Sequence, residues 1–164
     1  MCFKPNTQAL RLENVSLAVL RHLGIRVLFL DADNTVTTWN NPHVGAEVKD
    51  WIAQAKAMGF AVLIASNNSA QRLEPLRQAL EINCVEKANK PLPFRLRSVA
   101  KQLQVKPNQC AMIGDQLLTD MLAGNLAGMH TVLLRPIDLT AEFKGTKINR
   151  RIEKVLKKWL KLSV

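Results

Sequence analysis

The chemistry that this chain could carry starts with two carboxylates that stand two residues apart. Asp31 and Asp33 lie in the stretch DADNT at 31–35, directly after an apolar run at 27–30. One such carboxylate can attack phosphorus as a nucleophile while its neighbour donates and accepts protons. Asp, Asn and Thr are also common in turns, so the stretch taken alone fits an ordinary turn at a strand end equally well. Residues elsewhere in the chain have to decide between these two interpretations.

Four further residues with complementary chemistry follow other apolar runs of the chain. They are Ser66, Lys90, Asp115 and Asp120. Several carboxylates in one crevice repel one another and raise one another's pKa values unless a cation keeps them ionised, so the set implies a bound divalent metal. Oxygen ligands without a neighbouring His or Cys favour Mg²⁺. A lysine and a hydroxyl beside such a metal can hold a phosphoryl group, so the whole set indicates phosphoryl transfer through aspartate.

These residues can act together only if alternating strands and helices bring them to one place. Short apolar runs predict five strands, at 26–30, 60–65, 83–85, 110–113 and 131–134. Apolar residues at helical spacing fill the intervals, and a short helix that ends at Gly24 is predicted before the first strand. Asn68 or Ser69 is expected to cap the helix after the second strand. This alternation predicts an α/β fold with a doubly wound parallel sheet, in which the carboxyl ends of the strands form one ligand-binding edge.

Length and composition predict one globular domain over residues 1–164. A chain of 164 residues, of which 48% are hydrophobic and 22% charged, can bury a full core. The sequence has no apolar run long enough to span a bilayer, and its N-terminus lacks the apolar run of a signal peptide. A cytoplasmic protein is therefore expected.

The positive charge of the chain is concentrated near its C-terminus. The net charge is +10, and residues 144–161 hold eight Lys or Arg against one Glu, which accounts for +7. A basic helix is predicted at about 146–162, with apolar residues along one face: Ile148, Ile152, Val155, Trp159 and Leu162. Such a helix can dock on the sheet as an ordinary final helix, which is the favoured interpretation. It can also lie on a membrane with its basic residues on anionic headgroups.

Taken together, the polar clusters resemble the four motifs of haloacid dehalogenase superfamily phosphatases, in the expected order. The stretch at 31–35 resembles the first motif, Ser66 the second, Lys90 before Pro91 the third, and the segment GDQLLTD at 114–120 the fourth. The second, third and fourth motifs resemble in particular the small YqeG-like branch of type IIIA. Relatives of that branch include phosphatases that act on phosphatidylglycerophosphate in mitochondria and plastids. The first 24 residues match least well, so nothing is transferred onto them.

The resemblance implies a role for each matched residue. Asp31 would form a covalent aspartyl-phosphate, and Asp33 would protonate the leaving oxygen and then activate water. Mg²⁺ would be bound by the carboxylates of Asp31 and Asp115 and by the backbone carbonyl of Asp33. The phosphoryl oxygens would be held by Ser66, Asn67 and Lys90. Asp120 would stand one layer behind the metal and position Lys90 or a water molecule.

The resemblance also implies that the site is uncapped. Only a loop at 36–43 separates the first motif from the next helix, and one helix and one strand fill the interval between the second and third motifs. An open site suits a large or membrane-held substrate, or a partner protein, better than a small free metabolite. In this loop, Trp39 is expected to pack rather than to line the entrance.

The resulting expectation is a magnesium-dependent phosphatase that hydrolyses a phosphomonoester through Asp31. The candidate substrate is phosphatidylglycerophosphate, and the protein would then work peripherally at an anionic membrane. A soluble sugar phosphate or nucleotide is the alternative within the same chemistry. A non-enzymatic protein that binds nucleic acid through its basic helix is the alternative from another class. Two aspartates, a lysine and a metal site together argue against it, since a pure binding module needs none of them.

Overall fold

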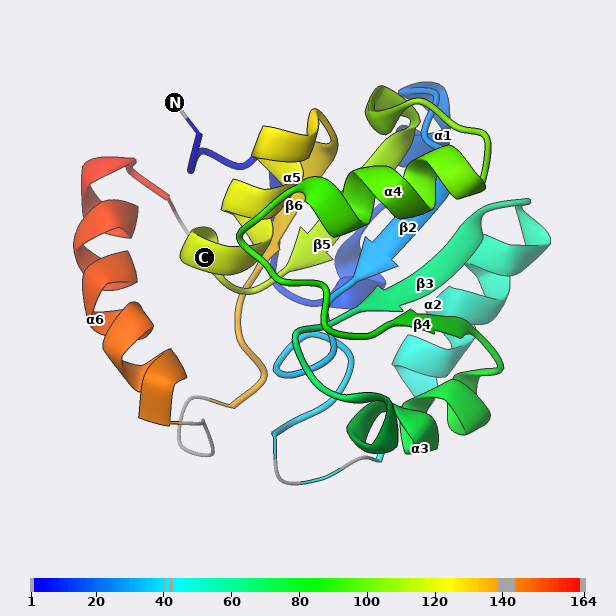
Figure 1. The fold of residues 1–164 in the computed structure, drawn as a ribbon, viewed down its shortest axis with the longest axis horizontal. Helices are drawn as coiled ribbons and strands as arrows, with labels where there is room; N and C mark the ends of the chain where they lie inside the picture. The colour runs from blue at the N-terminus through cyan, green and yellow to red at the C-terminus, as the bar shows by residue number, and fades with distance from the viewer. Residues whose placement is uncertain (1, 40, 42, 139–143, 163–164) are drawn as a thin grey trace.

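The fold is a six-stranded parallel sheet with helices on both faces (Figure 1). The computed structural model describes residues 2–39, 41, 43–138 and 144–162, with side chains outside 144–151. The strand order is β1-β6-β5-β2-β3-β4, and all neighbouring strands are parallel. The strands are β1 (Thr7–Ala9), β2 (Val27–Leu30), β3 (Ala61–Ala65), β4 (Asn83–Val85), β5 (Cys110–Gly114) and β6 (His130–Leu134). The predicted doubly wound α/β architecture is therefore confirmed.

The helices lie in groups on the two faces of the sheet. The α-helices are α1 (Leu17–His22), α2 (Ala46–Ala57), α3 (Ala70–Leu80), α4 (Phe94–Gln102), α5 (Leu122–Ala127) and α6 (Lys144–Trp159). The shorter segments are the 3₁₀ turns η1 (Leu12–Asn14) and η2 (Pro107–Gln109), and the π-helical turn η3 (Leu117–Met121). Helices α1, α2 and α3 cover one face of the sheet, and α4 and α5 cover the other (Figure 1). The apolar side chains of each group pack in a core on that face.

The apolar runs that predict the strands are continuous because the central strands are buried on both faces. In β2, Leu28 and Leu30 belong to the core beneath α1, α2 and α3, whereas Val27 and Phe29 belong to the core beneath α4 and α5. Successive side chains of a strand point to opposite faces, so a central parallel strand needs apolar residues at every position. The five predicted strands are confirmed, each to within one residue at its ends.

The sequence pattern does not predict the sixth strand, β1. It lies at the edge of the sheet beside β6, with Thr7 opposite Val132. Its side chains are exposed or half-buried, so it lacks an apolar run. A polar contact fixes the chain here instead, because Asn6 Oδ1 accepts hydrogen bonds from the backbone N–H of Thr131 at 2.8 Å and from its hydroxyl at 2.9 Å. The prediction of five strands is therefore wrong, because the sheet has this edge strand as a sixth.

The C-terminal helix α6 lies along the outside of the molecule and packs on η3 (Figure 1). It begins two residues before its expected start and ends at Trp159. Leu156 and Leu162 pack against an apolar cluster. The members of this cluster are Leu117, Met121 and Leu133. Glu153 is buried, and its Oε1 accepts a hydrogen bond from the backbone N–H of Leu118 at 3.0 Å.

The apolar stripe that was expected to dock α6 on the core faces solvent over most of its length. Three of its members are exposed: Ile152 at 50%, Val155 at 69% and Trp159 at 65%. Leu162 does reach the core, and the side chain of Ile148 lies outside the described residues. The helix does dock on the protein, as expected, but the expected docking face is wrong, because the neighbouring flank at Leu156 makes the contact. Within the described chain, every helix is too short or too polar to cross a bilayer.

Candidate active site

The site forms where three central strands end side by side. Leu30 of β2 lies opposite Ile64 of β3 on one side and Ile113 of β5 on the other. The backbone N–H of Asp31 donates to the carbonyl of Ile113 at 2.9 Å, which holds the first residue after β2 against β5. The residues that follow these strands therefore open onto the same carboxyl edge, as parallel pairing requires.

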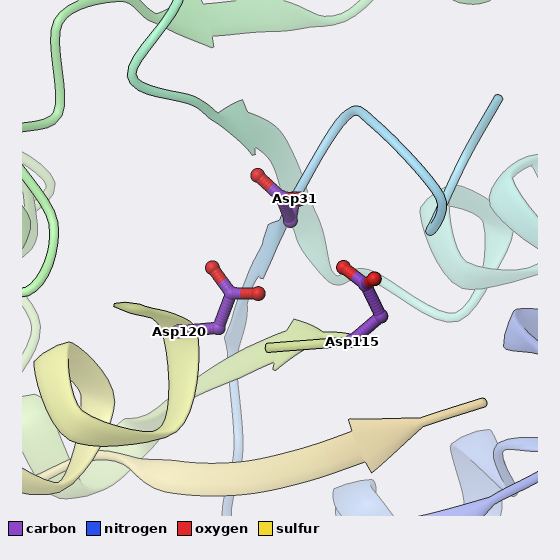
Figure 2. Close-up of side chains that lie close together, drawn as sticks. All are labelled: Asp31, Asp115 and Asp120. Carbon is purple, nitrogen blue, oxygen red and sulfur yellow. The ribbon is translucent and has the colours of Figure 1, made fainter. Parts of the chain in front are cut away.

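Three carboxylates converge at this edge (Figure 2). Asp31 follows β2, Asp115 follows β5 and Asp120 belongs to η3. One oxygen of each carboxylate lies within 4.8 Å of the corresponding oxygens of the other two, and all three residues are buried. Buried carboxylates at this spacing repel one another unless positive charge lies among them.

Lys90 supplies one positive charge to this cluster. Its Nζ donates to Oδ1 of Asp31 and to Oδ1 of Asp120, at 2.6 Å in each case, and its side chain is 3% exposed. Burial acts to lower the pKa of Lys90, but the negative charges of Asp120 and Asp31 outweigh burial and hold that pKa above its usual value. The ammonium group therefore stays charged.

Burial, together with the neighbouring carboxylates, makes Asp31 hard to ionise. Burial raises the pKa of Asp31 well above its usual value, and the carboxylate of Asp120 raises it further, while Lys90 opposes both effects. Three carboxylates and one ammonium give this buried group a formal excess of two negative charges. A divalent cation that prefers oxygen ligands fits both the charge and the donor atoms.

The carboxylates beside Asp31 differ in their partners. Asp120 uses both of its oxygens within the protein, because Oδ1 accepts from Lys90 and Oδ2 accepts from the backbone N–H of Gln116 at 3.1 Å. Asp120 is thus placed to position Lys90. All three carboxylates are close enough together to hold a metal ion, and in Asp120 both oxygens also accept these hydrogen bonds.

A glycine allows Asp120 to approach β5 closely. Gly114 ends the strand, and a Cβ at this position would collide with the carboxylate of Asp120. The next residue, Asp115, supplies its own carboxylate and accepts a 3.5 Å hydrogen bond from the Thr35 hydroxyl. The Gly-Asp pair of the fourth motif thus admits one carboxylate and contributes another.

Two of the residues expected to hold the phosphoryl group have partners of their own in the structure. Ser66 is buried at the end of β3, and its Oγ accepts a hydrogen bond from the backbone N–H of Asn68 at 3.2 Å. Asn67 makes two hydrogen bonds with the backbone of Lys90: Oδ1 accepts from its N–H at 2.8 Å, and Nδ2 donates to its carbonyl at 2.9 Å. The side chain of Asn67 therefore fixes the residue that bridges the carboxylates.

The side chain of Asp33 does not join the carboxylate cluster but contacts α3 and the residues before it. Its Oδ2 accepts from Nδ2 of Asn68 at 2.7 Å, and its Oδ1 accepts from the guanidinium of Arg72 at 3.2 Å. Ser69 stands at the N-cap position of α3 without a side-chain capping bond. Ser69 is therefore the N-cap residue, as expected, but neither its side chain nor that of Asn68 caps the helix, and the Asn68 amide binds the Asp33 carboxylate instead.

Arg72, in the first turn of α3, joins Asp33 to the loop after β2. Its guanidinium also donates to the carbonyl of Trp39 at 2.8 Å and lies 3.6 Å from the centroid of the Trp39 ring. A cavity of about 260 Å³ opens beside these residues, and Trp39 lines it. Trp39 packs against Arg72, as expected, and it also lines this cavity. The available signal for Arg72 is its place in the first turn of the helix that follows a strand ending at the site.

Comparison with known proteins identifies the family. The sequence profile of the haloacid dehalogenase-like hydrolases matches residues 13–128, which is more than half of the chain. The chain belongs to this family. Between β2 and α2, the described residues of this hydrolase form a loop with isolated bridges, and α3 and β4 fill the interval between Ser66 and Lys90. The expected uncapped fold is therefore confirmed for the described part of the chain.

Known relatives of this haloacid dehalogenase-like hydrolase include phosphatases. The probable phosphatase YqeG of Bacillus subtilis is 31% identical over 152 residues, which cover 93% of this chain and 88% of that protein. The chloroplastic phosphatidylglycerophosphate phosphatase 1 of Chlamydomonas reinhardtii is 28% identical over 158 residues, which cover 91% of this chain but 59% of that protein. The hydrolase is thus a phosphoric monoester hydrolase, and the resemblance expected from the motifs is confirmed.

A solved structure supports the fold. The crystal structure of an uncharacterized protein from Listeria monocytogenes serotype 4b superimposes with a TM-score of 0.56 at 15% identity. The superposition covers 77% of this chain and 99% of that one. At this identity the likeness concerns the arrangement of strands and helices alone.

Proposed function

We propose that this hydrolase is a magnesium-dependent phosphatase that works through an aspartyl-phosphate on Asp31. The observation that carries the proposal is the position of Lys90, whose ammonium bridges Asp31 and Asp120 within a buried group that also contains Asp115. An ammonium beside a buried carboxylate can bind the oxygens of a phosphoryl group that arrives at that carboxylate.

Asp31 and Asp33 divide the proposed reaction into two steps. First, a carboxylate oxygen of Asp31 attacks phosphorus, and the bond from phosphorus to the leaving oxygen breaks as Asp33 donates a proton to that oxygen. Second, the Asp33 carboxylate accepts a proton from water, the water oxygen attacks phosphorus, and the bond to Asp31 breaks to release phosphate. Lys90 and Ser66 hold the phosphoryl oxygens in both steps. Between the two steps, Arg72 keeps the Asp33 carboxylate at the edge of the site.

The donor atoms of the site fit the proposed magnesium ion. Asp31 and Asp115 would hold it through their carboxylates, and Asp33 through its backbone carbonyl. When bound, the ion supplies positive charge that keeps the carboxylates ionised and stabilises charge on the phosphoryl oxygens. Asp120 stays with Lys90 and the backbone of Gln116, so it positions the lysine rather than the substrate.

We propose phosphatidylglycerophosphate as the substrate, in preference to a soluble sugar phosphate or nucleotide. The similarity to a phosphatidylglycerophosphate phosphatase extends over 91% of this chain and supports this choice. The described part of the chain forms no additional domain over the carboxyl edge of the sheet, so a headgroup that remains in a bilayer could reach Asp31. The enzyme would then act peripherally, from the cytoplasm, at a membrane surface.

Phosphate release from two substrates tests the proposal. With magnesium, the wild-type protein is expected to hydrolyse an aryl phosphate and phosphatidylglycerophosphate in mixed vesicles, and acid quenching should trap phosphate on Asp31 for mass spectrometry. Asp31→Asn is expected to abolish both activities, whereas Asp50→Asn, an exposed site on α2, serves as the matched control and should retain them. Turnover by Asp31→Asn would overturn the nucleophile. Turnover of soluble esters without release from the lipid would move the assignment to a soluble substrate.

A further inference from the structure

We propose that the exposed apolar surface of α6, formed by Ile152, Val155 and Trp159, is the surface by which this enzyme binds an anionic lipid bilayer. This surface is called the α6 face below. The proposal rests on the proposed function only for the identity of the lipid that is hydrolysed. The surface itself follows from the exposure, packing and charge of α6.

The α6 face is apolar and open to solvent over two turns of the helix. Its members are spaced three and four residues apart, so their side chains lie along one side of the helix. Between 50% and 69% of each residue is exposed. Single exposed apolar residues are ordinary on a protein surface. Three neighbours that include a tryptophan form a contiguous patch of the kind that marks an interaction site.

The α6 face is distinct from the flank of α6 that holds the helix on the protein. Glu153 is 1% exposed and accepts a hydrogen bond from the backbone of Leu118, and Leu156 packs on the cluster beneath it. Residues 153 and 156 lie on the flank next to the α6 face. The helix is therefore fixed to the protein through the flank that carries Glu153 and Leu156. Among the described residues, the α6 face stays exposed and can contact another molecule.

Charge selects an anionic bilayer as that partner. Lys154, Lys158 and Lys161 are exposed on or directly after α6, and residues 144–161 together carry +7. An interfacial helix buries apolar side chains among lipids while its basic residues lie on anionic headgroups, and α6 offers both on neighbouring sides. Nucleic acid would use the lysines and could stack a base on Trp159, but it would leave Ile152 and Val155 without a partner. A second copy of the chain would bring another strongly basic helix against the first, which electrostatic repulsion opposes.

The same helix is attached to a segment of the active site. Glu153 binds the backbone N–H of Leu118 in η3, and η3 also carries Asp120. A bilayer that holds α6 would therefore hold the turn that completes the carboxylate cluster. This attachment gives the enzyme a means of remaining at the surface where phosphorylated headgroups lie.

Sedimentation of the full chain with vesicles tests the proposal. Vesicles of phosphatidylglycerol and phosphatidylcholine are compared with vesicles of phosphatidylcholine alone, at one salt concentration below and one above the range that screens surface charge. The test variant combines Val155→Gln with Trp159→Gln. The matched control combines Val19→Gln with Leu23→Gln, at two apolar residues of 51% and 49% exposure on and beside α1. Thermal unfolding and aryl phosphate turnover are measured for each protein.

Wild type and control are expected to bind the anionic vesicles, more weakly at high salt. The test variant is expected to bind roughly tenfold more weakly, because it loses the burial of two apolar side chains, while aryl phosphate turnover stays unchanged in all three proteins. Equal binding to both vesicle types, or unchanged binding by the test variant, would overturn the proposal. So would a dimer of the free protein that the test variant abolishes, or binding to RNA without binding to vesicles. A wild-type protein that binds anionic vesicles without turning over any ester would support this surface and count against the proposed function.

Discussion

Lys90 contacts Asp31 and Asp120 at the same distance of 2.6 Å, so one ammonium is divided between the proposed nucleophile and the carboxylate that positions the lysine. Asn67 holds the backbone of Lys90 on both its N–H and its carbonyl. The backbone from which the lysine reaches both carboxylates is therefore held in place. Its charge is insufficient to offset the burial of Asp31, whose pKa stays raised.

Asp31→Asn is expected to stabilise the metal-free protein at neutral pH while it abolishes activity. Burial, with Asp120 adding to it, raises the pKa of Asp31 in the folded state. The folded protein therefore binds more protons at Asp31 than the unfolded chain does, and stability is lost as pH rises above the unfolded pKa of about 3.9 toward the folded value. In chelator at pH 7, the variant should melt roughly 2–4 °C above wild type, the shift that about 1 kcal/mol produces in a domain of this size.

The difference in melting temperature should close as the pH approaches 4, because Asp31 is then protonated in wild type as well. Asp50→Asn, at an exposed carboxylate, should melt like wild type at both pH values. A lower melting temperature for Asp31→Asn at pH 7 would mean that the ion pair with Lys90 outweighs burial.

Arg72→Lys is expected to slow turnover of an aryl phosphate by about tenfold to a hundredfold in kcat, with little change in KM. The planar guanidinium of Arg72 binds the Asp33 carboxylate, binds the Trp39 carbonyl and stacks on the indole ring. Lysine keeps the positive charge but cannot make all three contacts at once. A misplaced proton donor slows the chemical step rather than substrate binding. Arg77→Lys, on the same helix and paired with Glu74, is the control. Wild-type kcat in Arg72→Lys would show that Arg72 does not position Asp33 during turnover.

Among the elements, those with buried surroundings are the easiest to predict from the sequence. Every residue of β2 is buried, so its apolar run is visible without knowledge of its partners. The edge at β1 depends instead on a contact between Asn6 and Thr131, which are 125 residues apart in the chain. A polar pair at that separation leaves no local pattern.

The site shows the same division between strands and helices. Asp31 and Asp115 directly follow central strands, and parallel topology alone brings such residues to one edge. Arg72 and Glu153 act from helices. The neighbour that a helical side chain meets depends on how the helix is rotated on the core, and hydrophobic spacing indicates an apolar side without indicating which of its flanks will dock.

Leu156→Ala is expected to lower the free energy of unfolding by about 1–2 kcal/mol. The loss is smaller than for truncation of a fully buried leucine, because Leu156 is half-buried. Val155→Ala, next to it in the chain but exposed, should change this free energy by less than about 0.5 kcal/mol. Urea denaturation of the two variants measures the difference. A larger loss for Val155→Ala would show that α6 docks through its other flank.

At the scale of the whole molecule, charge is divided between the interior and the tail. The buried carboxylate group has a formal excess of two negative charges, whereas residues 144–161 contribute +7 to a chain of +10. An anionic surface is therefore attracted to the outside of the protein. In the proposed reaction, the interior would gain positive charge from the metal ion before a phosphoryl group enters.

Magnesium is expected to raise the melting temperature of the entire protein by roughly 5–10 °C at a concentration one hundred times its Kd. A ligand that binds only the folded state stabilises it by about 2.7 kcal/mol at that ratio. Asp115→Ala should lose most of this rise, because it removes a carboxylate of the cluster. Differential scanning calorimetry after dialysis against chelator provides the measurement, with Asp50→Ala as control. The same rise in Asp115→Ala and wild type would place the ion elsewhere.

The two edges of the sheet are its shortest strands. β1 and β4 have three residues each, whereas the four strands between them have four or five. An open strand edge is a template onto which a strand of another molecule can add, and its length limits the hydrogen bonds that it can offer. Proteins gathered on a bilayer are crowded into a thin layer where such edge-to-edge aggregation is favoured. With edges this short, the enzyme should tolerate crowding at a membrane without polymerising through its sheet.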